Sequence, residues 1–115
     1  MKLRFHEQSI RVRLSQSEVA RLAADGNLTG RLEFPNGPSF EYAVKTGASL
    51  SASLTGSQLT VTLPSPETKH WAGSAQVAIS GTDGPLSISV EKDFQCLHGP
   101  ESENADAFPN PAGKH

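Results

Sequence analysis

The sequence predicts an α+β domain of eight strands and two helices, folded as an antiparallel barrel or sandwich. Three observations point to this class. Eight short runs alternate apolar and polar residues, turns rich in Gly, Asn and Pro separate several of them, and two segments follow helical spacing instead. Strands with one apolar and one polar face are typical of antiparallel sheets, whereas buried parallel strands read as continuous apolar runs.

The composition limits the classes of protein that fit. The chain has 115 residues and a net charge of −2, which suits one domain with a core of its own. A nucleic-acid-binding protein usually carries a basic surface, so we expect no nucleic acid as partner. No apolar run approaches the roughly 18 residues of a membrane span, and no signal-peptide core is found. A single cysteine, Cys96, favours the reducing cytoplasm.

The expected strands follow from the alternation. They cover residues 3–6, 10–14, 28–34, 40–45, 50–54, 59–63, 76–80 and 86–91. Turn-forming residues at 35–38, 55–57 and 81–85 separate three pairs of these runs. The apolar positions of the strands and helices predict a core that includes Leu14, Val19, Leu22, Leu32, Val44, Val61, Trp71, Ile79 and Ile88.

The first helix is predicted from a capping box. Ser15 and Glu18 stand three residues apart, so the Ser15 hydroxyl can accept from the Glu18 amide while the Glu18 carboxylate accepts from the Ser15 amide. Val19 and Leu22 follow at helical spacing. Gly26 supplies the left-handed residue that commonly ends a helix, so the spacing predicts a helix over 15–25.

A shorter helix is predicted over 65–72. Ser65 is expected to cap it and Pro66 to occupy its first position, where proline is tolerated. Trp71 is the expected core anchor, and Gly73 ends the segment.

The order of elements indicates an internal repeat. Residues 2–45 and residues 49–92 both read strand, strand, helix, strand, strand. We therefore expect one domain over residues 1–97, built as two ββαββ repeats that share a core. Residues 98–115 hold no further alternating run and read as an acidic, proline-containing tail.

Two stretches near the C-terminus are unusual in combination. Residues 91–97 read EKDFQCL, and residues 106–111 read DAFPNP. Together with the opening residues 1–4 and 9–19, they resemble a small bacterial family of uncharacterised proteins of about this length. The resemblance implies a bacterial, soluble, single-domain protein and brings no activity with it.

Cationic residues are concentrated in the first repeat. Residues 1–45 carry a net positive charge, and the rest of the chain carries a net negative one. Clustered guanidinium groups match carboxylate or phosphate oxygens in bidentate fashion, which favours an anion- or partner-binding face. The alternative is a solvated sheet face with cross-strand ion pairs. The five residues expected on this face are Arg4, Arg11, Arg13, Arg31 and Lys45.

Candidate metal ligands gather after the last strand. They are Asp93, Cys96, His98 and Asp106. Thiol and imidazole groups are soft or borderline ligands, but a structural zinc site normally has four N or S ligands at a recognised spacing, which is missing. A metal- or anion-binding, enzyme-like site near Cys96 and His98 is thus one alternative, and a solvated acidic tail is the other. The cofactor, if there is one, stays unidentified.

Binding fits the sequence better than catalysis does. No nucleophile elbow and no Gly-rich phosphate loop is found. Phe108 precedes Pro-Asn-Pro, which suits either a stiff chain end or a short segment presented to a partner. We expect Phe94, Leu97 and Phe108 to pack onto the domain. The sequence therefore predicts an accessory protein that engages a protein partner, or another copy of itself, through the Arg-rich face and the C-terminal segment, with an anionic small molecule as a further ligand.

Overall fold

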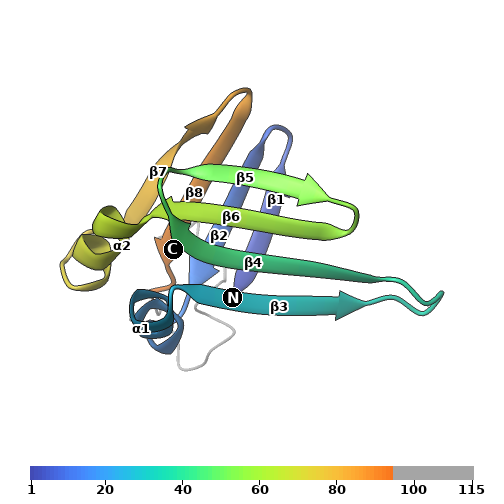
Figure 1. The fold of residues 1–115 in the computed structure, drawn as a ribbon, viewed down its shortest axis with the longest axis horizontal. Helices are drawn as coiled ribbons and strands as arrows, with labels where there is room; N and C mark the ends of the chain where they lie inside the picture. Colours follow the sequence, from blue (N-terminus) through green and yellow to red (C-terminus); the bar gives the residue numbers. More distant parts are fainter. Residues whose placement is uncertain (95–115) are drawn as a thin grey trace, which may run out of the picture.

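Eight strands and two helices form in the predicted order. A computed structural model describes residues 1–94 of the chain (Figure 1). The elements are β1 (Lys2–His6), β2 (Ser9–Leu14), α1 (Gln16–Asp25), β3 (Asn27–Glu33), β4 (Ser39–Gly47), β5 (Ser51–Thr55), β6 (Gln58–Pro64), α2 (Ser65–Ala72), β7 (Ala78–Asp83) and β8 (Leu86–Lys92). The α+β class and the ββαββ order of each half are therefore confirmed.

The strands form two four-stranded sheets. Sheet 1 has the order β1-β2-β8-β7 and sheet 2 the order β3-β4-β6-β5. The outer pairs of each sheet are antiparallel hairpins, but the central pairs, β2 with β8 and β4 with β6, are parallel. The prediction of purely antiparallel sheets was wrong at these two parallel pairs, which we call the parallel seams. Neither sheet closes into a barrel.

The helices explain the parallel seams. The chain leaves sheet 1 after β2, passes through α1 and enters sheet 2 at β3, and α2 carries it back from β6 to β7. Each sheet therefore combines one hairpin from each repeat. The two seams also agree in register, because Ile10 lies opposite Ile88 and Val12 opposite Val90, just as Leu59 lies opposite Tyr42 and Val61 opposite Val44.

One hydrophobic core is shared by both sheets and both helices. The strands of the two sheets cross at a large angle, and the helices lie together at one end (Figure 1). The buried residues of this core are Ile10, Val12, Leu14, Val19, Leu22, Leu28, Val44, Leu59, Val61, Leu63, Trp71, Ile79, Ile88 and Val90. Eight of the nine predicted core residues are among them.

Leu32 is the exception, since 53% of it is exposed. It lies on the core side of β3, as its alternation with Arg31 predicts. However, β3 and β4 project beyond the other strands (Figure 1), so nothing in the described part of the chain covers this end of their apolar face. The prediction that Leu32 is buried was therefore wrong.

The capping box of α1 forms as predicted. The Ser15 amide donates to Glu18 Oε1 at 2.9 Å, and the Glu18 amide donates to the Ser15 hydroxyl at 3.4 Å. The second oxygen of Glu18 accepts a hydrogen bond from the amino group of Met1. Gly26 ends the helix with φ of 76°, a conformation that glycine adopts without the Cβ clash of other residues.

The start of α2 differs from the prediction. Pro64, not Ser65, is the residue that precedes the helix, and no side chain caps it. Ser65 is already helical, and its hydroxyl donates instead to the carbonyl of Gly47 at 3.2 Å. Trp71 is fully buried, as expected, and its Nε1–H donates to the carbonyl of Val77 at 3.1 Å. Within residues 1–94, neither helix is long and apolar enough to cross a membrane.

Candidate functional site

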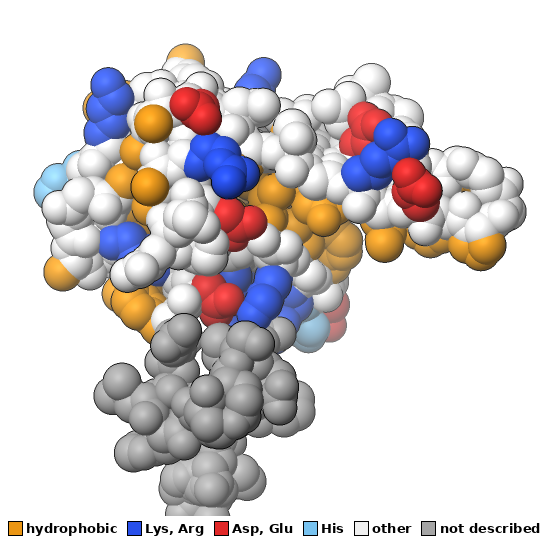
Figure 2. Space-filling model, turned by 90° about the horizontal axis from the view of Figure 1, so that it is seen from below, with side chains coloured by type: hydrophobic (Ala, Val, Ile, Leu, Met, Phe, Trp, Pro, Cys, Tyr) orange, Lys and Arg blue, Asp and Glu red, His pale blue; other side chains and the backbone are white. Residues whose placement is uncertain are grey.

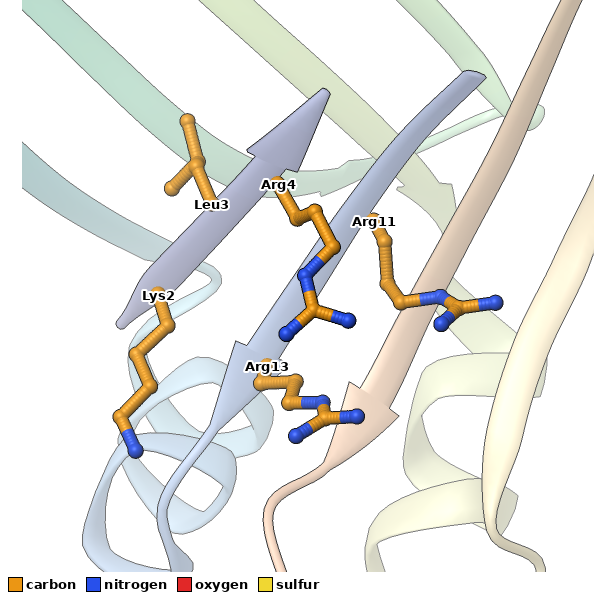
Figure 3. A pocket seen from close by; sticks show the side chains of 5 residues that line it. All are labelled: Lys2, Leu3, Arg4, Arg11 and Arg13. Atoms are coloured by element: carbon orange, nitrogen blue, oxygen red, sulfur yellow. The ribbon is translucent and has the colours of Figure 1, made fainter. Parts of the chain in front are cut away.

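Four cationic side chains share the outer face of the β1–β2 hairpin. Lys2 lies directly opposite Arg13, and Arg4 lies opposite Arg11. All four point away from the core because Leu3, Phe5, Ile10 and Val12 occupy the alternate positions. We call this set, Lys2, Arg4, Arg11 and Arg13, the cationic face (Figure 3).

Two carboxylates from the end of β8 contact the cationic face. Glu91 lies beside β2 through the parallel seam, 3.1 Å from Arg11 Nε and 3.7 Å from Arg13 Nε. Asp93 lies 3.0 Å from Lys2 Nζ. The hydroxyl of Ser89 donates to Glu91 Oε2 at 2.9 Å and so helps to hold this carboxylate. Within residues 1–94, Glu91 and Asp93 thus form ion pairs with Lys2, Arg11 and Arg13 of the cationic face.

The cationic face is open to solvent. The side chains of Lys2 and Arg11 are 45% and 48% exposed, and that of Arg13 is 26% exposed. They surround a hollow of about 40 Å³, whereas pockets for small molecules usually measure about 300–1,000 Å³. The hollow therefore fits a single anionic group presented from outside, and not a whole metabolite.

Arg31 and Lys45 do not belong to the cationic face. They lie on β3 and β4, on the outer side of sheet 2. Arg31 is 3.4 Å from Glu33 and 3.9 Å from Glu41, so acidic neighbours surround it. The structure therefore brings together three of the five predicted residues, Arg4, Arg11 and Arg13, and separates the other two.

Lys2 was missed by the sequence analysis. Its signal was present, because Lys2 alternates with the core-side Leu3 just as Arg4 does. The carboxylates of Glu91 and Asp93 could be assigned to this face only with the knowledge that β8 pairs with β2.

The metal-site hypothesis gains no support from residues 1–94. Within that range, no three side chains of His, Cys, Asp or Glu are placed to hold a metal ion. Of the candidate ligands, Asp93 is described, and it pairs with Lys2. Cys96, His98 and Asp106 lie outside the described residues, as do Leu97 and Phe108. Phe94, the last residue described, is 60% exposed.

A second hollow lies between the end of α1 and the start of α2. It measures about 290 Å³, and its lining residues are Ala23, Ala24, Asp25, Gly26, Thr46, Ser65, Thr68 and Lys69. The buried Thr68 hydroxyl donates to the carbonyl of Pro64, the residue that precedes its helix, at 2.8 Å. Its lining contains one acidic residue, Asp25, and one basic residue, Lys69. This pair of charges indicates no particular ligand or reaction.

Comparison with known protein families identifies the family of this chain. A model for a family of unknown function, DUF7009, matches residues 1–112. The chain belongs to DUF7009. Because the match covers nearly the whole sequence, it confirms the resemblance to an uncharacterised family. No curated protein and no solved structure matches the chain. DUF7009 carries no assigned activity, so the function is argued from the cationic face.

Proposed function

We propose that this protein binds an acidic segment of a partner protein through the cationic face. The observation that carries the proposal is the cross-strand square of Lys2, Arg4, Arg11 and Arg13, which brings four cationic side chains to one solvent-facing surface. The cationic face is shallow and open to solvent, so it can accept carboxylates that are presented by an extended peptide.

The chemistry of the side chains supports an anionic group as ligand. A guanidinium group donates in a planar fork that matches both oxygens of a carboxylate. Glu91 already occupies this kind of position between Arg11 and Arg13, and an incoming carboxylate would take its place. Hydroxyl groups continue this surface across sheet 1, where Ser80 and Ser89 lie 3.1 Å apart.

The C-terminal segment is part of the proposal. Phe108 and its prolines lie outside the described residues, so their role as an anchor on the partner stays a prediction. We place the interaction in the cytoplasm, because a single cysteine suits a reducing compartment.

A labelled oligoglutamate peptide tests the proposal. Its binding is followed by fluorescence anisotropy for the unchanged protein and for Arg4→Gln combined with Arg11→Gln. The matched control is Lys45→Gln combined with Lys69→Gln, which removes the same charge from β4 and α2, outside the cationic face. The cationic-face variant is expected to bind at least about tenfold more weakly, and the control to bind as before.

Two results would contradict the proposal. Equal losses in both double variants would mean that net charge, and not the arrangement of the cationic face, drives binding. A preference for duplex DNA over the peptide would make nucleic acid the ligand. Binding should also weaken between low salt and about 0.15 M salt, since exposed charges are screened over about 8 Å there.

A further inference from the structure

The β3–β4 hairpin forms an arm with an uncovered apolar side. Leu32 and Phe34 are 53% and 48% exposed. Leu32 faces the same side as Leu28, which is buried in the core at the base of β3. Figure 2 shows this projecting part with hydrophobic side chains along one side and oppositely charged side chains on another. The arm therefore extends the inner face of sheet 2 into solvent.

The arm also exposes the edge of a strand. β3 is the outermost strand of sheet 2, so one side of its backbone has no neighbouring strand among residues 1–94. An exposed edge with an apolar face readily pairs with another strand. The β5 edge is blocked in part, because the Ala52 amide donates to Asp83 of β7 at 3.1 Å. The β1 edge carries Lys2 and Arg4, whose like charges oppose pairing with a second β1.

The hydrogen bonds between β3 and β4 show which residues of β3 direct their backbone N–H and C=O groups away from sheet 2. The amide of Phe34 donates to the carbonyl of Pro38 in the turn to β4, at 3.1 Å. Backbone groups alternate in direction along an antiparallel strand. Leu32 and Gly30 therefore direct their backbone groups toward β4, whereas Arg31 and Glu33 direct theirs away from sheet 2.

We propose that a second copy of this chain pairs with the arm, β3 against β3 in antiparallel register, with the two-fold axis at Leu32. Arg31 then lies opposite the partner's Glu33, and the two residues exchange their outward backbone hydrogen bonds. On the apolar side, Leu32 contacts the partner's Leu32, and Phe34 lies opposite the partner's Gly30, a position that the ring of Tyr42 covers within each chain.

Charge complementarity selects this register. Two Arg–Glu pairs form across the dimer axis, and opposite charges that face each other across strands stabilise a sheet. Moving the axis by one residue, to Arg31, would place two arginines opposite each other, which is destabilising. The register with its axis at Leu32 also covers the two most exposed apolar side chains of β3 and its turn, Leu32 and Phe34.

This dimer is independent of the proposed binding function. The cationic face belongs to the outer side of sheet 1, and the dimer extends the edge of sheet 2. The dimer would therefore present two cationic faces at once. Loss of dimerisation and loss of peptide binding can be measured separately, on different variants.

Sedimentation equilibrium over a range of protein concentrations tests the dimer. The unchanged protein is expected to associate into dimers, and Leu32→Asp is expected to raise the dimer dissociation constant at least about tenfold, because it places two carboxylates together on the axis. Leu54→Asp is the matched control, since Leu54 is 66% exposed on β5. It should leave the dissociation constant unchanged.

A charge exchange tests the register itself. Arg31→Glu places like charges opposite each other and should weaken the dimer, and the addition of Glu33→Arg should restore it. Thermal melting establishes that each variant is folded. A monomer at every concentration, a dimer that survives Leu32→Asp, or a double variant that fails to regain dimerisation would each overturn the proposal.

Discussion

The ring of Tyr42 lies directly over Gly30, its cross-strand neighbour at the base of the arm. A Cβ atom on residue 30 would come within 2.2 Å of Tyr42 Cε2. The same ring lies 6.0 Å from that of Phe40, measured between centroids. The absence of a side chain at Gly30 is therefore what allows the Tyr42 ring to lie across β3.

Gly30→Ala should destabilise the protein through this contact. The added methyl group must displace the Tyr42 ring, and overpacking of this kind typically costs about 1–3 kcal/mol. Urea denaturation measures the change in the free energy of unfolding. In a Tyr42→Ala background the same substitution should cost clearly less, because the ring is gone. Equal costs in both backgrounds would show that the ring does not restrict residue 30.

Leu22→Ala should show how far α1 seals the core. Leu22 is fully buried, and removal of such a side chain costs about 2–5 kcal/mol through lost burial and the cavity that remains. Leu54→Ala is the control, because Leu54 is 66% exposed and surface changes usually stay within about 0.5 kcal/mol. Similar losses for the two variants would contradict the assigned core.

Glu18→Gln should change how stability depends on pH. Partial burial is the largest single influence on the pKa of Glu18 and raises it, but hydrogen bonds from Met1 and Ser15 and the charge of the amino group lower it by more, to a net value below the ordinary 4.5. A carboxyl group whose pKa is lowered on folding stabilises the protein above its unfolded pKa. That stabilisation is lost as the pH falls through the folded pKa.

The substitution is informative because Gln keeps one side-chain oxygen for the Ser15 amide, but loses the charge and the second oxygen that accepts from the Met1 amino group. The unchanged protein should be more stable than Glu18→Gln at neutral pH, by about 1 kcal/mol. The difference should shrink as the pH falls below 4.5. Denaturation curves at several pH values measure it, and a difference that does not vary with pH would refute the role given to the charge.

The turns at Glu7 and Gly56 occupy equivalent places in the two repeats, each between a pair of hairpin strands. Their φ angles are 51° and 59°, a region that disfavours side chains. Glu7→Gly should therefore stabilise the protein by about 0.5–1 kcal/mol, after allowance for the greater chain entropy of glycine. Gly56→Glu, the reciprocal change, should destabilise it. Chemical denaturation measures the free energy of unfolding of both variants. A Glu7→Gly variant less stable than the unchanged protein would contradict the argument.

Glu91→Gln should tighten the binding of an acidic peptide. Glu91 competes with an incoming carboxylate for Arg11 and Arg13, and its neutralisation adds one net positive charge to the cationic face. The affinity should rise about two- to fivefold, since the groups are partly exposed and screened by salt. Weaker binding would mean that Glu91 holds the arginines in place for the ligand.

The sequence predicts the elements of this fold far better than their pairing. Period-two alternation is local, so it located eight strands and their apolar faces, and the capping box located the start of α1. Alternation does not say which strand lies beside which. Each repeat offers two hairpins, and only the crossings through α1 and α2 decide that β2 meets β8 and that β4 meets β6 in parallel.

The same limit applies to the cationic face and to Leu32. Arg4 and Arg11 were grouped correctly because they share one hairpin, but Arg31 was grouped with them although it lies in the other sheet. Leu32 was assigned to the correct side of its strand, yet its burial depends on how far the opposite sheet extends. Properties that depend on distant partners were therefore the ones that sequence reasoning could not provide.

The order of strands in the two sheets has a consequence for synthesis on the ribosome. All four strands of sheet 2 lie within one continuous stretch, residues 27–64, so this sheet can pair completely while the chain is still growing. Sheet 1 joins β1 and β2 to β8 and β7, so the first hairpin made must wait for the last. A nascent chain that has released only β1 to β6 carries an unpaired backbone edge on β2, and sheet 1 is completed only when β8 arrives and pairs with that edge.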